Sequence, residues 1–496
     1  MTATKVRSVV IGLDLGTSGL KALAVAQDGS VLARASHGYS TSRPEPGSAE
    51  QDPAEWMAAC DSVMAQLAAS VDPTSWSAVG LSAMLPTLVM LDEAYDPIGP
   101  AITWEDGRAE AEADAIRAEF SDAVLYRLTG QRLDARYLLP MYLHAAASGA
   151  SPTYIVGAKD HLFQRLTGRL ATDPSTAAGY GCFSLRTSAW DPALVATVTS
   201  TATGTGPTLP EVLESSASAP LDAALAARWG CAAGIPVVLG GADSVLGAYG
   251  LGIRSPGDIA VISGTSTVVI GWSEVARFDP QSRYLVTPMA GAGYGLELDL
   301  MTTGSALAWL SALLGVGGPE ELVTLAESAA LDNAPIVLPY LGPGEQGALW
   351  DPTLTGLIQG VTLGTGRADL ARGLVAGIVM EVARCVAVLG GSQGERGVIR
   401  LTGSSGASGL FRQDLADATG LAVFYNPDEH DHSALGAALF AGDSVLDWSS
   451  AAPVAGVEVR PRPAQSAAWS KRFERHEQAR RGLHARAAIN QTVREP

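Results

Sequence analysis

The chain has 496 residues, with 51 Asp and Glu against 33 Lys and Arg, so its formal net charge is −18 at pH 7. The length predicts two large domains or about three smaller ones. An apolar share of 47% with 55 glycines excludes a disordered or fibrous protein. A chain this acidic repels phosphate backbones, so we expect no nucleic-acid partner. A small phosphorylated ligand is still allowed, because backbone amides and a metal ion can bind one.

The cysteines and apolar stretches indicate the compartment. Cys60, Cys182, Cys231 and Cys385 form no C-x-x-C pair, which favours free thiols in a reducing cytosol. No secretory leader is recognisable at the N-terminus, and the most apolar later stretch, 374–389, carries two charged residues. We therefore expect a cytoplasmic protein with no membrane segment.

The first part of the chain predicts a β-hairpin with a polar turn. Strands are expected over 8–13 and 20–26, joined by the turn Asp14-Leu15-Gly16-Thr17-Ser18-Gly19, and a third strand over 31–35. The next predicted elements are a helix over 53–69 capped by Asp52, strands over 79–81 and 87–91, and an acidic helix over 109–120.

The polar turn is a candidate phosphate loop. Its glycines let the backbone approach a ligand closely, and the hydroxyls of Thr17 and Ser18 with neighbouring amides can hold phosphate oxygens. The carboxylate of Asp14 can hold Mg²⁺ through water. The alternative is an ordinary polar hairpin turn. The chain contains no G-x-x-x-x-G-K-[ST] motif, which disfavours a P-loop NTPase.

A second candidate lies near the middle of the chain. The apolar run 235–239 leads into Gly240-Gly241-Ala242-Asp243-Ser244, and an apolar helix follows. Open α/β sheets bind ligands at the carboxyl ends of their strands, so Asp243 is a candidate base in a closing cleft. The alternative is that Asp243 caps the following helix.

The second half repeats the opening pattern. A strand over 258–263, the turn Gly264-Thr265-Ser266 and a strand over 267–272 resemble the first hairpin, at an offset of 248 residues from Gly16 to Gly264. A repeat at half the chain length predicts two related domains. The similar stretch is short, so chance similarity is the alternative.

The remaining predicted elements are mostly helical. They are helices over 304–314, 370–389, 410–419 and 433–440, and a strand over 398–402 that ends at Gly403-Ser404-Ser405-Gly406. That Gly-Ser segment is either a further ligand loop or an ordinary strand-to-helix turn. The basic stretch 459–496 is expected to be a solvated terminal helix and tail, with a binding arm as the alternative.

Taken in order, these motifs resemble the FGGY carbohydrate kinases, and most of all their xylulokinase branch. Residues 14–21 resemble the family's D-x-G-T-[ST]-x-x-K phosphate loop, and residues 240–244 resemble the G-G-G-D-N segment that carries the catalytic base. The other matching stretches are 42–44, 50–53, Trp56, 104–108, 159–160, 173–175, 263–266, 304–305, Trp309, 338–341 and 403–408. The resemblance covers essentially the whole chain.

The resemblance implies an α/β fold of two ribonuclease-H-like domains, as in actin and hexokinase, with an interdomain cleft. It places the sugar and phosphate-loop domain at 1–245, the nucleotide domain at 246–455 and a basic helix or tail at 456–496. It implies ATP and Mg²⁺ as cofactors, Asp243 as base, and Asp14 with Asp243 as the metal-holding residues. The implied ATP-binding residues are Thr17, Ser18, Lys21, Gly264, Thr265, Ser266, Gly304, Gly403, Ser404 and Ser408. The implied substrate-binding residues are Met84, Leu85, Pro86, Asp243 and Ser244.

One departure from the family concerns the sugar pocket. The xylulokinase Q-M-H-G loop aligns with Met84-Leu85-Pro86-Thr87, so Pro86 stands where the family has a sugar-binding His. Glu105 also replaces the usual amide of the W-[NQ]-D-x-R motif. We therefore expect a more apolar pocket wall than in a xylulokinase, and either weak use of D-xylulose or a replacement contact from another residue.

The expected function is ATP-dependent phosphorylation of a ketopentose such as D-xylulose. A gluconate, ribulose or polyol kinase of the same family is the alternative, and a non-catalytic sugar- or nucleotide-binding protein is a further one. The expected partner is a small sugar or polyol, and a homodimer is a candidate assembly.

Overall fold

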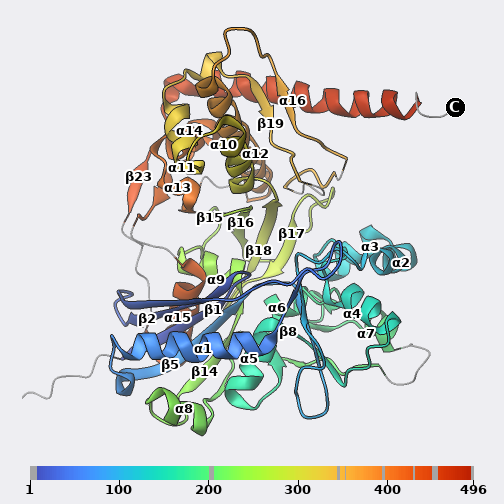
Figure 1. The fold of residues 1–496 in the computed structure, drawn as a ribbon, viewed down its shortest axis with the longest axis vertical. Coiled ribbons are helices and arrows are strands. Elements are labelled where there is room, and N and C mark those ends of the chain that lie inside the picture. Colours follow the sequence, from blue (N-terminus) through green and yellow to red (C-terminus); the bar gives the residue numbers. More distant parts are fainter. Residues whose placement is uncertain are drawn as a thin grey trace, which may run out of the picture.

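The molecule consists of two lobes, one above the other in the view of Figure 1. The computed structural model describes residues 8–199, 206–342, 347–351, 353–393, 397–427, 431–448 and 456–492. The blue-to-green first half forms the lower lobe, and most of the second half forms the upper lobe.

The lower lobe is built on a six-stranded sheet in the order β13-β14-β5-β1-β2-β3. Strands β1, β2 and β3 are antiparallel, whereas β5 and β14 run parallel to β1. The central strands are buried along most of their length, which is why they read as apolar runs rather than as alternating patterns. The strands are β1 (Val9–Leu15), β2 (Gly19–Ala26), β3 (Val31–Gly38), β5 (Trp76–Ala83), β13 (Ser218–Pro220) and β14 (Pro236–Ala242).

The upper lobe repeats this topology. Its sheet has the order β17-β18-β16-β15-β21-β22-β23, in which β15, β16 and β18 are antiparallel while β21 and β22 run parallel to β15. The two shared cores, β3-β2-β1-β5-β14 and β18-β16-β15-β21-β22, confirm the predicted pair of ribonuclease-H-like domains. The strands are β15 (Ile259–Ser263), β16 (Thr267–Ser273), β17 (Leu285–Pro288), β18 (Tyr294–Leu300), β21 (Ile399–Gly403), β22 (Val423–Tyr425) and β23 (Val457–Val459).

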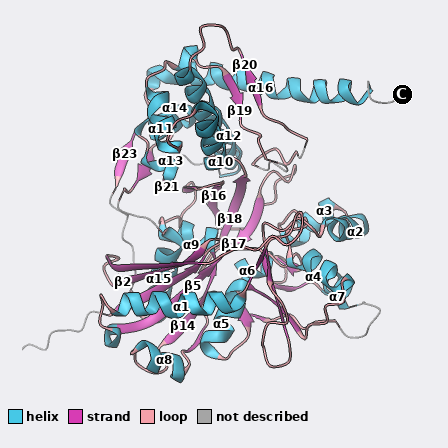
Figure 2. Ribbon diagram, in the orientation of Figure 1, coloured by secondary structure: helices cyan, strands magenta, loops and turns pink. Residues whose placement is uncertain are grey.

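Helices cover both sheets (Figure 2). In the lower lobe these include α1 (Pro53–Ala68), α5 (Ala158–Thr167), α6 (Pro174–Ala178), α8 (Ala223–Trp229) and α9 (Asp243–Gly250). In the upper lobe they are α10 (Gly304–Leu314), α11 (Pro319–Glu327), α12 (Arg367–Gln393), α13 (Ser404–Ala407), α14 (Gly409–Thr419) and α16 (Pro463–Thr492). Helix α15 (His432–Val445) returns to the lower lobe and packs on α9 and β1.

A smaller layer extends the lower lobe on the right of Figure 1, where helices α2, α3 and α4 lie. It contains the four-stranded sheet β4-β7-β6-β8 and three short helices. These elements are β4 (Glu50–Gln51), β6 (Thr87–Leu91), β7 (Ala101–Thr103), β8 (Tyr154–Gly157), α2 (Glu110–Phe120), α3 (Asp122–Thr129) and α4 (Leu138–Ala147).

The remaining short elements of the two lobes are β9 (Ala171–Thr172), β10 (Phe183–Ser184), β11 (Ala189–Trp190), α7 (Pro192–Thr199), β12 (Glu211–Val212), β19 (Ile336–Leu338), β20 (Leu357–Gln359) and the 3₁₀ turns Pro73–Ser75 and Leu331–Asn333.

The hairpin β17–β18 joins the lobes. It belongs to the upper sheet, yet it reaches the segment after α3 in the lower lobe (Figure 1). The amide of Val286 donates to the carbonyl of Gly130 at 2.8 Å, and the Tyr126 hydroxyl donates to the Tyr284 carbonyl at 2.8 Å. The hairpin therefore places upper-lobe side chains against lower-lobe ones.

The C-terminal helix corrects one expectation. Helix α16 is docked rather than solvated, because Trp469, Arg472 and His476 are almost fully buried against the upper lobe. His476 Nε2 lies 2.6 Å from Glu381 Oε1, and Arg472 donates to three backbone carbonyls, including that of Pro335. The charge count favoured a solvated helix because most of its basic residues do lie outside this contact face.

Helix α12 is long and apolar enough, by length and composition, to cross a membrane. However, 83% of its most apolar window is buried inside the upper lobe, and Glu381 is ion-paired with Arg384 at 3.1 Å. These are the properties of a core helix.

Candidate active site

A cavity of about 710 Å³ opens between the lobes. Its walls come from both predicted phosphate turns, from the strand ends and from the β17–β18 hairpin. The residues that line it are Thr17, Ser18, Tyr39, Thr41, Arg43, Leu85, Pro86, Trp104, Glu105, Gln131, Arg136, Tyr137, Ala178, Gly179, Asp243, Ser244, Thr265, Ser266, Val268, Leu285, Thr287, Glu297, Asp299 and Met301.

Three side chains hold the first turn in place. Gln51 Nε2 donates to the Thr17 carbonyl at 2.7 Å, Trp104 Nε1 donates to Thr17 Oγ1 at 2.9 Å, and the Tyr39 hydroxyl donates to the Gly16 carbonyl. Because Trp104 fills an acceptor site on Thr17 Oγ1, the hydroxyl hydrogen of Thr17 is left to donate to a ligand oxygen. The turn is therefore an oriented set of donors.

The second turn faces the same cavity. Thr265 and Ser266 line it, and the turn closes with a hydrogen bond from the Gly264 amide to the Ser266 carbonyl at 2.8 Å. Gly304 packs behind it, where a Cβ would lie 2.2 Å from the Gly264 carbonyl oxygen. The two turns occupy equivalent places in the two sheets, β1 to β2 and β15 to β16, so related hairpins supply donors from both lobes.

Asp243 stands where β14 ends and α9 begins. Gly240 has φ +68°, and a Cβ there would lie 1.8 Å from the Leu81 carbonyl oxygen, so this bend requires glycine. Asp243 is the first residue of the helix rather than its cap, and it lines the cavity. Burial, and then the charge of Asp14, raise its pKa to about 7, against a hydrogen bond from the Ser244 amide.

Two further acids from β18 lie in the cavity. Burial and the neighbouring charge of Asp299 raise the pKa of Glu297 to about 8, while a hydrogen bond from Ser244 opposes the shift. Burial also raises the pKa of Asp299 to about 6, against the positive charge of Arg136. Hydrogen bonds run from Tyr137 to Gln131 and from Thr287 to Glu297. This part of the cavity therefore contains several carboxyl groups together with other hydrogen-bonding side chains.

These shifts give a stability prediction. Each acid has a folded-state pKa above its unfolded value, so the folded protein binds more protons between about pH 4 and pH 8 and its stability falls as the pH rises through that window. Asp243→Asn should therefore raise the ligand-free unfolding temperature at pH 8 by about 3–8 °C, and by less at pH 5. Thermal unfolding monitored by circular dichroism measures this. Glu93→Gln, on the surface, is the charge-matched control. An unfolding temperature for Asp243→Asn no higher than wild type at pH 8 would contradict the predicted strain.

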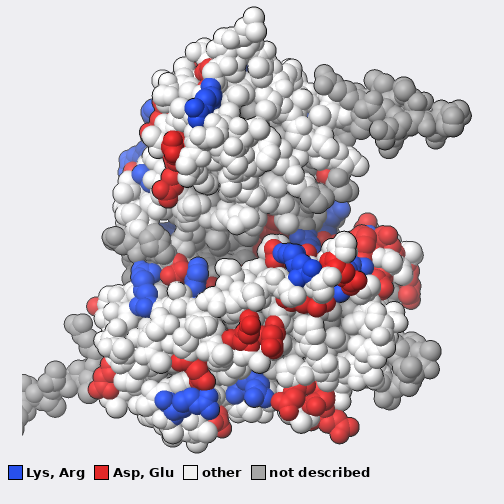
Figure 3. All heavy atoms as spheres, in the orientation of Figure 1, with Lys and Arg blue, Asp and Glu red and all other residues white. Residues whose placement is uncertain are grey.

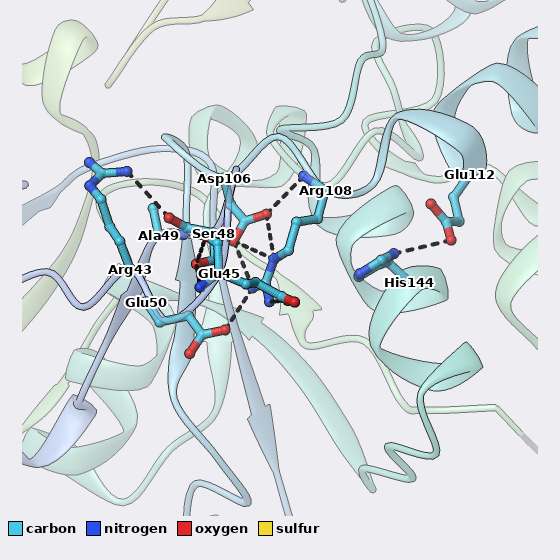
Figure 4. A network of polar contacts seen from close by, with 9 residues as sticks. All are labelled: Arg43, Glu45, Ser48, Ala49, Glu50, Asp106, Arg108, Glu112 and His144. Atoms are coloured by element: carbon cyan, nitrogen blue, oxygen red, sulfur yellow. Dashed lines mark hydrogen bonds and ion pairs between the residues drawn. The ribbon is translucent and has the colours of Figure 1, made fainter.

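Both basic side chains among the described residues that line the cavity are already paired. Arg43 Nη2 lies 3.0 Å from Glu105 Oε2, and Arg136 Nη2 lies 2.5 Å from Asp134 Oδ2. The loop that carries Trp104 and Glu105 is itself fixed, because Arg108 forms ion pairs with Asp106, with Glu45 and with Glu50 of β4 (Figure 4).

Some of the predicted site residues do not line this cavity. Lys21 points to the loop before α15, where its Nζ lies 3.0 Å from Asp431 Oδ1. Met84 is buried in the lower core. Gly403 ends β21 next to the second turn, where a Cβ would lie 1.6 Å from the Ser263 carbonyl oxygen. Ser404 begins α13, and Ser408 caps α14 by accepting from the Phe411 amide. Asp14 is 8% exposed and accepts from Ser82 Oγ at 2.8 Å.

The donor set fits a magnesium ion that arrives with a phosphorylated ligand. Asp14 and Asp243 are carboxylates close enough for the charge of Asp14 to raise the pKa of Asp243, and Mg²⁺ needs only one or two carboxylates beside phosphates and water. Within the described residues, no group of three or more His, Cys, Asp or Glu forms a protein-only metal cage.

Sequence reasoning missed Tyr39, Gln131, Arg136, Tyr137, Glu297 and Asp299. None of these residues belongs to a recognisable sequence motif, so the sequence alone gives little reason to select them. The available signal was the alternation of Glu297 and Asp299 in β18, since two acids on one face of a largely buried strand are unusual.

Two ribonuclease-H-like lobes with a Gly-Thr-Ser turn from each facing one cavity define the actin and hexokinase fold class. Residues 9–250 match the N-terminal domain model, and residues 259–444 the C-terminal domain model, of the FGGY family of carbohydrate kinases. The chain belongs to this family. It is therefore a sugar kinase, and ATP is the co-substrate that the family implies.

Individual relatives point to several substrates. The chain is 30% identical to the xylulose kinase of Klebsiella pneumoniae over 444 residues, covering 88% of this chain and 90% of the relative. It is 31% identical to the glycerol kinase of Gloeobacter violaceus over 474 residues, covering 92% of each. The solved gluconate kinase of Lactobacillus acidophilus shares the fold, with a TM-score of 0.89, 23% identity and coverage of 96% and 98%.

Proposed function

We propose that this protein is a Mg²⁺- and ATP-dependent kinase of a neutral ketose or polyol, with a ketopentose such as D-xylulose as the first candidate, acting in the cytoplasm. The observation that carries the proposal is the position of Asp243 at a strand end in the cavity that also receives Thr17, Ser18, Thr265 and Ser266.

Phosphoryl transfer depends on positioning and charge neutralisation more than on covalent chemistry. Asp243 would accept the proton of the sugar hydroxyl as that hydroxyl attacks the γ-phosphate. Thr17 and Ser18 would donate to γ-phosphate oxygens, while Gly264, Thr265 and Ser266 would hold the β/γ region. Mg²⁺, held by Asp14 and Asp243 through water, would supply positive charge at the phosphates.

The upper lobe would supply the rest of the nucleotide site. Gly304 and Gly403 pack closely against the second turn and the residue before it, and together with Ser404 and Ser408 they would line the adenosine. Lys21 would neutralise phosphate charge only by leaving Asp431. Closing of the two lobes would exclude water, which otherwise competes with the sugar as acceptor.

The charge of the cavity favours a neutral substrate over an aldonate. Four carboxylates line it, those of Glu105, Asp243, Glu297 and Asp299, against two arginines that are each already paired with an acid. A substrate carboxylate would find no unengaged cation among these lining residues, whereas hydroxyl groups can donate to carboxylates. This observation counts against the gluconate kinase alternative and leaves the ribulose and polyol kinase alternatives open.

The pocket wall has one apolar and one polar side. Leu85 and Pro86 offer no side-chain donor or acceptor, whereas Gln131, Tyr137 and Glu297 lie in the same cavity. Leu85, Pro86, Asp243 and Ser244 remain the proposed substrate residues, whereas Met84 is buried in the lower core and does not line the cavity. A replacement contact for the family's His would come from the polar side.

The effect of Pro86→His tests this wall. If the missing histidine limits D-xylulose binding, the substitution should raise kcat/KM for D-xylulose by about 10-fold, since one added hydrogen bond contributes on the order of 1–2 kcal/mol. Leu85→His is the control, because it adds the same group one residue away. Steady-state kinetics with unchanged kcat/KM in Pro86→His and efficient use of D-xylulose by wild type would show that the polar side has taken over the contact.

A screen for ADP release tests the function as a whole. Purified protein with Mg²⁺-ATP is offered ketopentoses, pentitols, tetritols and aldonates, and sugar-dependent ADP is measured with a coupled assay. We expect turnover with at least one neutral substrate. Nucleotide binding without ADP release for every sugar tested would instead support a non-catalytic binding protein.

A further inference from the structure

Behind the cavity lies a buried group of charges that the proposed chemistry does not use. Lys159 Nζ lies 3.2 Å from Asp160 Oδ1 and 3.2 Å from Asp173 Oδ1, and each of the three side chains is at most 1% exposed. The Tyr180 hydroxyl donates to Asp160 at 2.7 Å. One cation and two acids come from α5 and from the segment before α6, so this buried triad cross-links two elements of the lower lobe.

Ser175 connects this triad to the residue before Asp243. The Ser175 hydroxyl donates to Asp173 Oδ2 at 2.5 Å and accepts from the Ala242 amide at 2.9 Å. It is 1% exposed. A serine hydroxyl has one hydrogen, and here Asp173 takes it, so the oxygen lone pairs must face the Ala242 amide. The triad thereby fixes the orientation of the hydroxyl that holds the end of β14.

The fit around this contact is close. A Cβ on Gly241 would lie 2.8 Å from Ser175 Oγ and 3.5 Å from Asp173 Oδ2, so glycine lets the strand approach the serine. The Gly240 amide also donates to the Ser215 carbonyl at 2.9 Å. The backbone just before Asp243 is therefore anchored at two successive points, which matters because Asp243 has no capping side chain of its own at the start of α9.

A buried triad of this kind contributes little net stability, because the desolvation of its charges offsets their attraction. Positional precision is the property it can supply. We propose that Ser175, oriented by Asp173 and Lys159, is a positioning residue for Asp243, holding the strand end so that the carboxylate faces the cavity. This proposal rests on Asp243 being the base, as proposed above.

The test compares Ser175→Ala with Ser215→Ala. Both serines are almost fully buried, and both hydroxyls donate to Asp173 Oδ2, that of Ser215 at 3.2 Å, but the Ser175 hydroxyl alone accepts from the Ala242 amide. We expect Ser175→Ala to lower kcat about 10-fold or more with the KM for ATP and sugar within about two-fold of wild type. Ser215→Ala should keep kcat within about two-fold.

The split between kcat and KM supplies a readout that a general loss of structure would not give. A displaced Asp243 slows the transfer step, while ATP and sugar stay bound by other groups of the cavity, so kcat should fall and both KM values should stay unchanged. Thermal unfolding and circular dichroism show whether each variant is folded at the assay temperature.

Asp243→Asn is measured in parallel to separate the two proposals. If Asp243→Asn retains near-normal turnover, the assignment of the base fails. If Asp243→Asn is inactive but folded Ser175→Ala matches Ser215→Ala in kcat, the base assignment stands and the positioning role of Ser175 is refuted. An increase in KM alone in Ser175→Ala would also refute it.

Discussion

Replacement of Asp243 by Asn should lower kcat by at least about 100-fold, the low end for loss of a positioned proton acceptor. The affinity for ATP should stay within about three-fold of wild type, because the phosphate donors of the two turns are untouched and Mg²⁺ can still be held through water by Asp14 and by the side-chain oxygen of the introduced asparagine. The variant keeps the shape of the side chain and removes its ability to take the proton. Single-turnover kinetics for transfer and equilibrium titration for ATP binding measure the two quantities separately.

Glu105→Gln is the matched control for this experiment. It removes a negative charge from the same cavity and introduces the amide that relatives of the xylulokinase branch carry, but it leaves the proposed base in place. Its kcat should stay within about three-fold of wild type. Equal losses in both variants would mean that overall cavity charge, rather than proton transfer at Asp243, governs turnover.

The second large effect concerns substrate charge. Xylitol and xylonate share a five-carbon chain but differ by a carboxylate at one end, and we expect kcat/KM for the neutral compound to exceed that for the acid by at least about 100-fold. At an effective dielectric constant of about 20, two like charges about 5 Å apart repel by roughly 3 kcal/mol, which is a factor of more than 100. The same preference should hold for D-glucitol over D-gluconate.

The source of this discrimination can be located in the cavity. Glu297→Gln should reduce the ratio of kcat/KM for the neutral compound to kcat/KM for the acid, whereas Glu93→Gln on the surface should leave this ratio unchanged. The comparison should be made above pH 8, because the raised pKa of Glu297, about 8, leaves its side chain mostly protonated near neutrality. A wild type that phosphorylates aldonates as well as polyols would show that Arg43 or Arg136 exchanges its acidic partner for the substrate.

The parts of the fold that follow local chemistry were predictable from the sequence. The two Gly-Thr-Ser turns and their apolar flanks predicted paired hairpins, and both turns now line one cavity. Asp52 caps α1 as expected, its side chain accepting from the Ala54 amide. The sequence indicated a strand that ends in two glycines just before Asp243, and Gly240 there adopts a left-handed conformation.

Long-range placement was not predictable in the same way. Glu297 reaches the cavity because the β17–β18 hairpin crosses from the upper sheet to the segment around Gly130, a contact between residues more than 150 positions apart. Ser175 meets Ala242 only through the register of β14 against α6. The charged composition of α16 suggested a solvated helix. Its docking on the upper lobe is decided instead by a few buried residues, such as Trp469 and His476. On the face of the molecule drawn in Figure 3, the charged side chains gather mainly on the lower lobe and along the boundary between the lobes.

The most direct test of the central claim is the fate of the γ-phosphate. With the best neutral substrate from the screen, ³¹P nuclear magnetic resonance follows ATP, ADP, inorganic phosphate and sugar phosphate in one reaction. The account predicts one phosphorylated sugar for each ADP formed, negligible inorganic phosphate, and loss of both products in Asp243→Asn. ADP and inorganic phosphate appearing together, with no sugar phosphate and no dependence on Asp243, would contradict it.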